Sequence, residues 1–254
     1  MTQTLSKEAC LEAAALLLAR RESNQKGDAL PASCRPTNFA DALAIQAATV
    51  EASGKKIAGW KCLVPLNPAQ TIVGPVLEGT VQQGAECLVK STESGKTLIE
   101  PEIAFVLSAD LPARAEGYTN EEVDAAIGTT HMALELLQRR YAPNDELIFA
   151  DRQADCLLNQ GIFLGPEITK AQAYDAGTIN LSIDDASYEG KHPNLSAQAP
   201  IYWFVDFACK NGLNLEKGQA IITGSYAGAI EVPVKTTEIK YEGFGEYQVT
   251  FKEI

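Results

Sequence analysis

The residue pattern of this chain changes sharply near residue 57, and that change limits the folds it can adopt. Before Ile57, apolar side chains recur at intervals of three and four, the spacing of a helix that buries one face. After Ile57, glycine and proline interrupt short apolar runs, as at Gly59, Pro65 and Gly74, and this texture favours strands and loops. A chain with helices first and strands afterwards is expected to belong to the α+β class.

Two helices are predicted in the first part of the chain. One spans residues 6–21, where leucine and alanine dominate and Leu11 and Leu18 lie on one face. The other spans residues 38–54, and Gly54 supplies a plausible C-terminal stop. The polar, proline-containing segment between them breaks any continuous helix.

The second part is expected to contain further helices over Thr119–Ile127 and Ile201–Lys210. Thr119 and Glu122 have the spacing of a capping box, which marks a helix start. The segment Tyr247–Phe251 alternates large apolar with polar residues and predicts a half-buried strand.

Domain organisation follows from the same patterns. We find no internal repeat and no low-complexity linker, so the simplest expectation is one domain over residues 1–254. Its helical part is 1–56, and its β-rich part, 57–254, is expected to form a sheet or barrel.

Composition limits the binding partners and the cellular compartment that we expect for this protein. Lysine and arginine number 21 and aspartate and glutamate 33, which gives a net charge of −12 with both histidines neutral. Such a surface repels nucleic acid and anionic membranes, and a small anionic substrate would need a local cation. The six cysteines form no Cys-x-x-Cys pair and are expected to be buried. Because neither a secretion signal nor a transmembrane stretch is visible, we expect a cytoplasmic protein.

The apolar run Ile99–Leu107 contains two glutamates near its start, Glu100 and Glu102. In an extended strand their i, i+2 spacing points both carboxylates to one face, where they repel each other unless a positive charge lies between them. A divalent cation would meet that need, while the alternative is a pair of exposed carboxylates at a strand end. Pro101 lacks an N–H donor, which predicts an edge or an irregular feature there.

A third carboxylate, Glu135, stands inside the apolar segment Ala133–Leu137. Burying it alone is costly, so it either pairs with Arg139 or Arg140 or joins Glu100 and Glu102 around a cation. Three carboxylates without histidine or cysteine favour Mg²⁺ or Mn²⁺ over zinc. His131 lies nearby and is interpreted as a structural histidine.

Lys61 is also unusual because its neighbours are mostly apolar. It either extends its amine to the surface or, when partly buried, transfers protons or holds an anion. Near the C-terminus, Thr223 and Ser225 lie in a turn whose hydroxyls and amides could receive a substrate carboxylate; an ordinary turn is the alternative.

These segments, in this order, resemble the 2-keto-4-pentenoate hydratase branch of the fumarylacetoacetate hydrolase superfamily. The matching segments are the alanine-rich first helix, 39–46, Gly59–Trp60–Lys61, 100–104, 131–135, 155–165 and the turn 223–225. Each segment is weak evidence alone, but their joint order and spacing are specific.

The resemblance implies a distorted β-barrel or roll in which Glu100, Glu102 and Glu135 hold Mg²⁺ or Mn²⁺. In that family the metal binds the 2-oxo acid end of the substrate. Lys61 would belong to the acid/base apparatus, with Glu78 as its acidic partner. Two departures affect substrate identity more than metal binding: Leu63 stands where relatives commonly have glycine, and Cys156 where they have asparagine.

We therefore expect a metal-dependent lyase that adds water to a small 2-hydroxydienoate and gives a 4-hydroxy-2-oxo acid. Decarboxylation of a 2-oxo-3-enedioate is the first alternative, and hydrolysis of an acylpyruvate the next, although the two histidines offer no obvious base for it. A catalytically silent partner subunit is the remaining one. Family members usually associate, and apolar side chains on several faces of the helix near Ile201 add to the expectation of a homo-oligomer; the alternative is that this helix is buried within one subunit.

Overall fold

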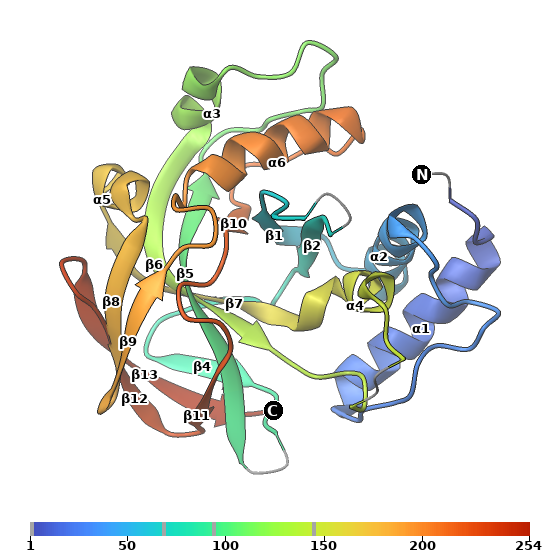
Figure 1. Ribbon diagram of the computed structural model, residues 1–254, viewed down its shortest axis with the longest axis horizontal. Helices are drawn as coiled ribbons and strands as arrows, with labels where there is room; N and C mark the ends of the chain where they lie inside the picture. The colour runs from blue at the N-terminus through green and yellow to red at the C-terminus, as the bar shows by residue number, and fades with distance from the viewer. Residues whose placement is uncertain (1–2, 68–69, 93–94, 144–145) are drawn as a thin grey trace.

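The computed structural model describes residues 3–67, 70–92, 95–143 and 146–254, and it shows helices at one end and two curved sheets at the other (Figure 1). The predicted α+β class is confirmed, with the N-terminal helices preceding the sheets. In the described part of the chain, no helix is both long and apolar enough to cross a membrane.

The helical end consists of α1 (Lys7–Ser23) and α2 (Phe39–Ser53), close to the predicted bounds. The Ser6 and Asn38 side chains cap the two N-termini, and Gly54 ends α2 in the left-handed conformation. Short α4 (Phe149–Ala154), which the sequence analysis did not predict, packs against α2. A small apolar core of its own holds this end together, formed by residues such as Ala13, Leu17 and Ile45.

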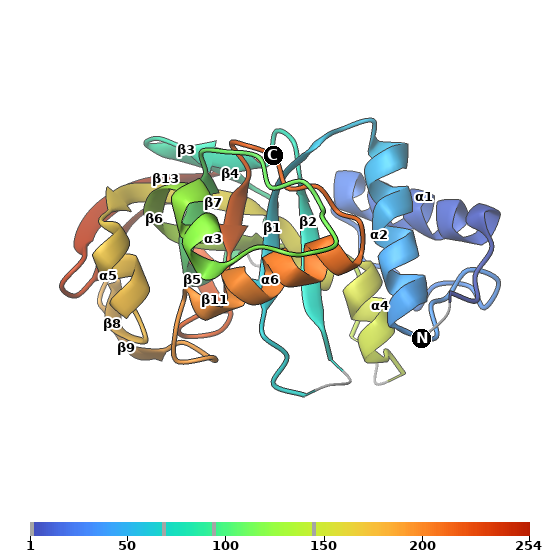
Figure 2. The same ribbon diagram turned by 90° about the horizontal axis from the view of Figure 1, so that it is seen from above.

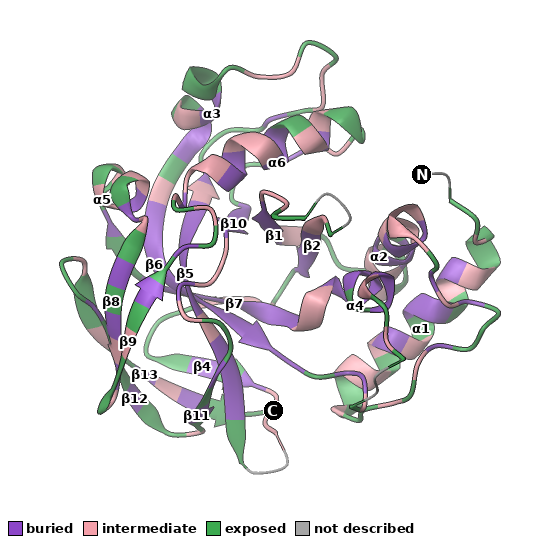
Figure 3. Cartoon of the chain, in the orientation of Figure 1, coloured by how far each residue is buried: buried purple, intermediate pink, exposed green. Residues whose placement is uncertain are grey.

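The larger sheet places its strands in the order β2-β1-β10-β5-β6-β7-β3, with β11 also paired to β5. Its strands are β1 (Ile57–Leu63), β2 (Ile72–Leu77), β3 (Val81–Gln83), β5 (Lys96–Leu107), β6 (Ile127–Leu137), β7 (Asn159–Ile168), β10 (Ala220–Ile222) and β11 (Ile230–Pro233). The central strands β5, β6 and β7 are buried along most of their length (Figure 3).

The smaller sheet has the order β4-β13-β12-β8-β9 and curves around the same core. Its strands are β4 (Glu86–Val89), β8 (Thr178–Ile183), β9 (Ala186–Lys191), β12 (Thr236–Tyr241) and β13 (Gly245–Glu253). Phe105, Phe163, Tyr241 and Phe251 fill the space enclosed by the sheets. The β-rich part is thus a distorted half-barrel, as expected.

Three helices lie beside the strands (Figure 2). They are α3 (Asn120–Ala126), α5 (Lys170–Asp175) and α6 (Ala199–Lys210). The α3 capping box of Thr119 and Glu122 is present as predicted, whereas α5, only six residues long, was not foreseen. Helix α6 packs on β1 through its buried face and leaves Trp203 half-buried.

Strand β5 has a gap along one edge that determines where the acidic residues lie. It pairs with β6 along almost its whole length. On its other side, the part of β5 that pairs with β11 ends at Ile99, and the part that pairs with β10 begins at Ala104. Within the gap, the Tyr226 amide donates to the Pro101 carbonyl oxygen at 3.0 Å. The irregular feature predicted from Pro101 is confirmed, and Glu100 and Glu102 lie at this gap.

Candidate metal centre

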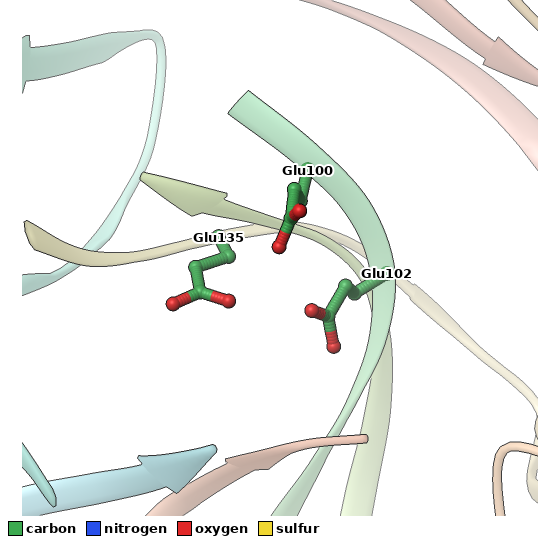
Figure 4. Close-up of side chains that lie close together, drawn as sticks. All are labelled: Glu100, Glu102 and Glu135. Atoms are coloured by element: carbon green, nitrogen blue, oxygen red, sulfur yellow. The ribbon is translucent and has the colours of Figure 1, made fainter. Parts of the chain in front are cut away.

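The structure brings together the three glutamates from β5 and β6 (Figure 4). Glu100 is directly opposite Glu135 in the antiparallel pairing, and Glu102 follows on the same face two residues later. One carboxylate oxygen from each residue lies within 4.8 Å of those from the other two. Glu102 and Glu135 are buried, and Glu100 is half-buried.

Burial and mutual repulsion act on these carboxylates together. Loss of solvent is the larger cause and the charge of Glu135 the next, and together they raise the pKa of Glu100 to about 7. The same two causes, with Glu100 added, raise the pKa of Glu102 well above its ordinary value. Like charges directly opposite each other in a sheet are destabilising, so this site needs positive charge.

Lys61 supplies part of that charge. Only 8% of this residue is exposed, so it does not extend to the surface. Its Nζ donates to Glu135 Oε1 at 2.7 Å and to the Leu157 carbonyl oxygen at 3.2 Å. Burial alone would lower the pKa of Lys61, but the three glutamates outweigh it and raise this pKa above its usual value. Lys61 therefore holds its proton in this environment.

The two arginines considered as partners of Glu135 lie elsewhere. Arg139 is exposed, and the Arg140 guanidinium donates from Nε to Asp155 Oδ1 at 2.5 Å. Neither arginine therefore pairs with Glu135.

The single positive charge of Lys61 does not balance three carboxylates, and one carboxylate oxygen lacks a hydrogen-bond partner. Glu135 Oε2 is buried and receives no hydrogen bond from any described residue. Buried polar atoms in folded proteins are rarely left without a partner. Three converging carboxylates, one with a free buried oxygen, are the donor set that hard divalent cations such as Mg²⁺ and Mn²⁺ take.

The turn after β10 also reaches this centre. The Gly224 amide donates to Glu102 Oε2 at 2.7 Å. Gly224 has φ +129°, and a Cβ there would lie 2.8 Å from Leu63 Cδ1, so this position requires glycine. Ser225 lines the pocket beside the site, whereas Thr223 is fully buried and its carbonyl oxygen is hydrogen-bonded to His192 Nε2.

The glutamates and Lys61 lie at a pocket of about 510 Å³, a size suited to a small ligand. A second lysine, Lys191, also lines it and is exposed. The other walls are mainly apolar and include Leu63, Ile72, Leu137, Leu157, Leu158 and Pro193. A larger hollow of about 1030 Å³ lies near the end of α1, and its lining includes exposed or half-buried charged residues such as Lys26, Lys90 and Glu231.

Glu78 does not join the centre. In the β1–β2 hairpin, Lys61 pairs with Gly74, whereas Leu77 pairs with Ile57 at the far end. Glu78 follows Leu77, is exposed, and accepts a hydrogen bond from the Lys56 amide at 3.4 Å. The structure therefore does not support the expected partnership between Glu78 and Lys61, because the hairpin register carries the two side chains to opposite ends.

The sequence analysis missed Asn159, whose Nδ2 donates to Glu135 Oε1 at 2.8 Å. A polar residue at the start of a buried apolar strand was the available signal. It also treated His131 as structural, which agrees with the hydrogen-bond contacts of its ring nitrogens with the Gly165 carbonyl oxygen and the Thr129 hydroxyl, both 3.0 Å long.

Comparison with known proteins finds matches among solved structures only. No protein-family profile and no curated protein sequence matches the chain. Among solved structures, 4-oxalocrotonate decarboxylase from Pseudomonas putida G7, complexed with magnesium and adipate, has a TM-score of 0.77 and 19% identity, and the match covers 99% of this chain and 100% of that one. The same enzyme complexed with calcium and acetate gives 0.76 and 19% over the same shares.

A more distant match is maleylpyruvate hydrolase from Sphingobium sp. SYK-6, in complex with manganese(II) ion and pyruvate. It has a TM-score of 0.50 and 15% identity, over 76% of this chain and 69% of that one. At these identities the similarity establishes the fold. The chain has a fold of the fumarylacetoacetate hydrolase type.

Proposed function

We propose that this protein belongs to the fumarylacetoacetate hydrolase superfamily and is a divalent-cation-dependent lyase for small 2-oxo or 2-hydroxydienoic acids. The observation that carries the proposal is the convergence of Glu100, Glu102 and Glu135, beside Lys61, at a pocket of ligand size. Bound Mg²⁺ or Mn²⁺ would supply Lewis-acid stabilisation of the negative charge that develops on the substrate's 2-oxygen. The solved neighbours bound to magnesium, calcium and manganese support this choice of cation.

The side chains of the pocket have separate tasks in this proposal. The three glutamates would hold the cation, whose positive charge would attract the anionic 2-oxo acid end of the substrate. Lys61 Nζ carries a proton that it would deliver to the substrate carbon chain. Leu63, Ile72 and Leu157 exclude water around that carbon chain, which strengthens the electrostatic interactions at the acidic end.

Two reactions of this class remain, and we favour decarboxylation of a 2-oxo-3-enedioate over hydration of a 2-hydroxydienoate. Hydration needs a second group to position and deprotonate water, and Glu78, expected in that role, lies outside the pocket. Lys191 offers a second cation at the pocket for the far carboxylate of a dicarboxylic substrate. The decarboxylase neighbour, which matches over its full length, was solved with the dicarboxylate adipate.

One experiment separates these reactions. The Mn²⁺-loaded protein is incubated with a 2-hydroxydienoate or with a 2-oxo-3-enedioate, while ultraviolet absorbance and carbon dioxide release are followed. Carbon dioxide from the enedioate supports decarboxylation, and loss of diene absorbance without carbon dioxide supports hydration. The absence of turnover with either substrate would refute the proposed lyase activity.

The cation ligands are tested in parallel by Glu135→Gln, which removes a charge at nearly constant volume. Because Glu135 offers the free buried oxygen, calorimetry should show Mn²⁺ affinity lowered at least about tenfold, as for loss of a ligand or its support. The matched control is Glu121→Gln, on the exposed side of α3, which should leave affinity unchanged. An unaltered Mn²⁺ affinity in Glu135→Gln would reject the ligand assignment.

A further inference from the structure

The two oxygens of the Glu135 carboxylate have different surroundings. Oε1 accepts from Lys61 Nζ at 2.7 Å and from Asn159 Nδ2 at 2.8 Å. Oε2 accepts from no described residue, although it is equally buried. The two hydrogen bonds to Oε1 fix the orientation of the carboxylate, because turning its plane away would break both of them.

Asn159 can keep its hydrogen bond to Glu135 only if its own backbone stays in place. It is fully buried, begins β7, and pairs with Leu137 at the end of β6. Leu137 is two residues after Glu135 on β6, and the residue of β7 that pairs with Glu135 is Ile162, so the Asn159 side chain must reach along the strand to Glu135. A small shift of the β7 start would therefore break the 2.8 Å bond.

Arg21, in the last turn of α1, holds that start. Its Nη1 donates to the Asn159 carbonyl oxygen at 3.0 Å and its Nη2 to the Gln160 carbonyl oxygen at 2.5 Å. The rigid fork of the guanidinium suits two adjacent carbonyls better than a lysine would. A physical connection thus runs from the helical end of the molecule to the carboxylate cluster.

We propose that Asn159 is a positioning residue of the cation site, held in place by Arg21, and that it leaves Oε2 as the oxygen of Glu135 available to the cation. The inference rests on the proposed function, because it assumes that Glu100, Glu102 and Glu135 bind a divalent cation. It adds a role for α1, which contributes no carboxylate to the cluster.

The test is Asn159→Leu, which keeps the approximate shape of the side chain and deletes the amide donor. Mn²⁺ affinity is measured by calorimetry, and stability by thermal unfolding with chelator present. Loss of a hydrogen bond that supports a metal ligand typically costs about 10- to 100-fold in affinity, and we expect that range here. Arg21→Met should weaken Mn²⁺ binding in the same direction by a smaller factor.

The matched control is Gln153→Met. Gln153 is another fully buried amide, and its Nε2 donates to the Val73 carbonyl oxygen, away from the carboxylates. It should lose stability in chelator as Asn159→Leu does but keep the wild-type Mn²⁺ affinity. That contrast separates positioning from a purely structural role.

The outcomes distinguish the two proposals. If the wild-type protein binds no Mn²⁺, the proposed function fails. If Glu135→Gln weakens binding but Asn159→Leu leaves it within about twofold of wild type, a change well below the expected range, the positioning role is wrong while the metal site stands. Should Asn159→Leu not fold, Arg21→Met decides, and wild-type affinity in that variant overturns the proposal.

Discussion

Replacing Lys61 with methionine tests how charge is shared in the acidic centre. The substitution keeps most of the apolar stem and deletes the ammonium. Lys61 is 8% exposed and its partner Glu135 is completely buried. Removing one partner of a buried ion pair leaves an uncompensated charge and costs about 3–5 kcal/mol, which we expect for the cation-free protein.

A bound divalent cation should reduce that cost. It would supply the positive charge that Glu135 loses, so that the main remaining loss is the hydrogen bond from Nζ to the Leu157 carbonyl oxygen. A single hydrogen bond contributes about 1 kcal/mol. The destabilisation by Lys61→Met should therefore fall by about 2–4 kcal/mol when the cation is present. Because coupling is reciprocal, the variant should bind Mn²⁺ about 30- to 700-fold more tightly than wild type.

The assay compares urea unfolding of both proteins at pH 8 with chelator and with saturating Mn²⁺, and measures Mn²⁺ affinity by calorimetry. Lys210→Met is the control, since Lys210 is exposed and pairs only with Asp206 on the same helix; its effect should stay below about 0.5 kcal/mol in both conditions. Turnover by Lys61→Met should be lost although the cation binds. Equal destabilisation by Lys61→Met with and without Mn²⁺ would refute the reasoning.

Two further predictions concern pH and assembly. Burial lowers the pKa of His192 to about 4, below the 6.5 of an unperturbed histidine, so the unfolded chain takes up this proton first and stability is lost as pH falls from 6.5 toward 4. Between pH 7.5 and 5, His192 should account for a loss of about 2 kcal/mol in unfolding free energy that is absent in His192→Gln, and an identical pH dependence of the two proteins would contradict this assignment. We also expect a homo-oligomer, and light scattering coupled to size-exclusion chromatography that gave a monomer at micromolar concentration would reject it.

The sequence predicted the identity of the acidic cluster because two separate signals pointed to it. Glu100 and Glu102 share a face by strand alternation, and Glu135 stands out as a charge within an apolar run. The pairing that sets Glu135 opposite Glu100 depends on the register between β5 and β6, which no local pattern specifies. Glu78 shows the same limit, because a hairpin register decided whether it could reach Lys61.

The backbone of the segment beside the cluster could not be predicted from the sequence, because the local preferences of its residues argue against the conformation that they adopt. Cys156, Leu157 and Leu158 all have left-handed φ values, 52°, 51° and 69°. For L-residues with a Cβ this region is crowded, and each such residue costs of order 1–3 kcal/mol. No sequence-based reasoning would place three consecutive non-glycine residues there.

The surrounding contacts explain why that costly turn persists. Before it, the Asp155 carboxylate and carbonyl oxygen accept from Arg140; within it, the Leu157 carbonyl oxygen accepts from Lys61; after it, the Asn159 carbonyl oxygen accepts from Arg21. Three cationic side chains thus bind one short segment, from α1 (Arg21), from β1 (Lys61) and from the loop after β6 (Arg140). Charge-assisted hydrogen bonds contribute about 1.5–3 kcal/mol each, which is comparable to the strain. The turn therefore stores strain where it presents one carbonyl to Lys61 and leads directly into Asn159, so the least predictable part of the backbone is the part that positions the acidic centre.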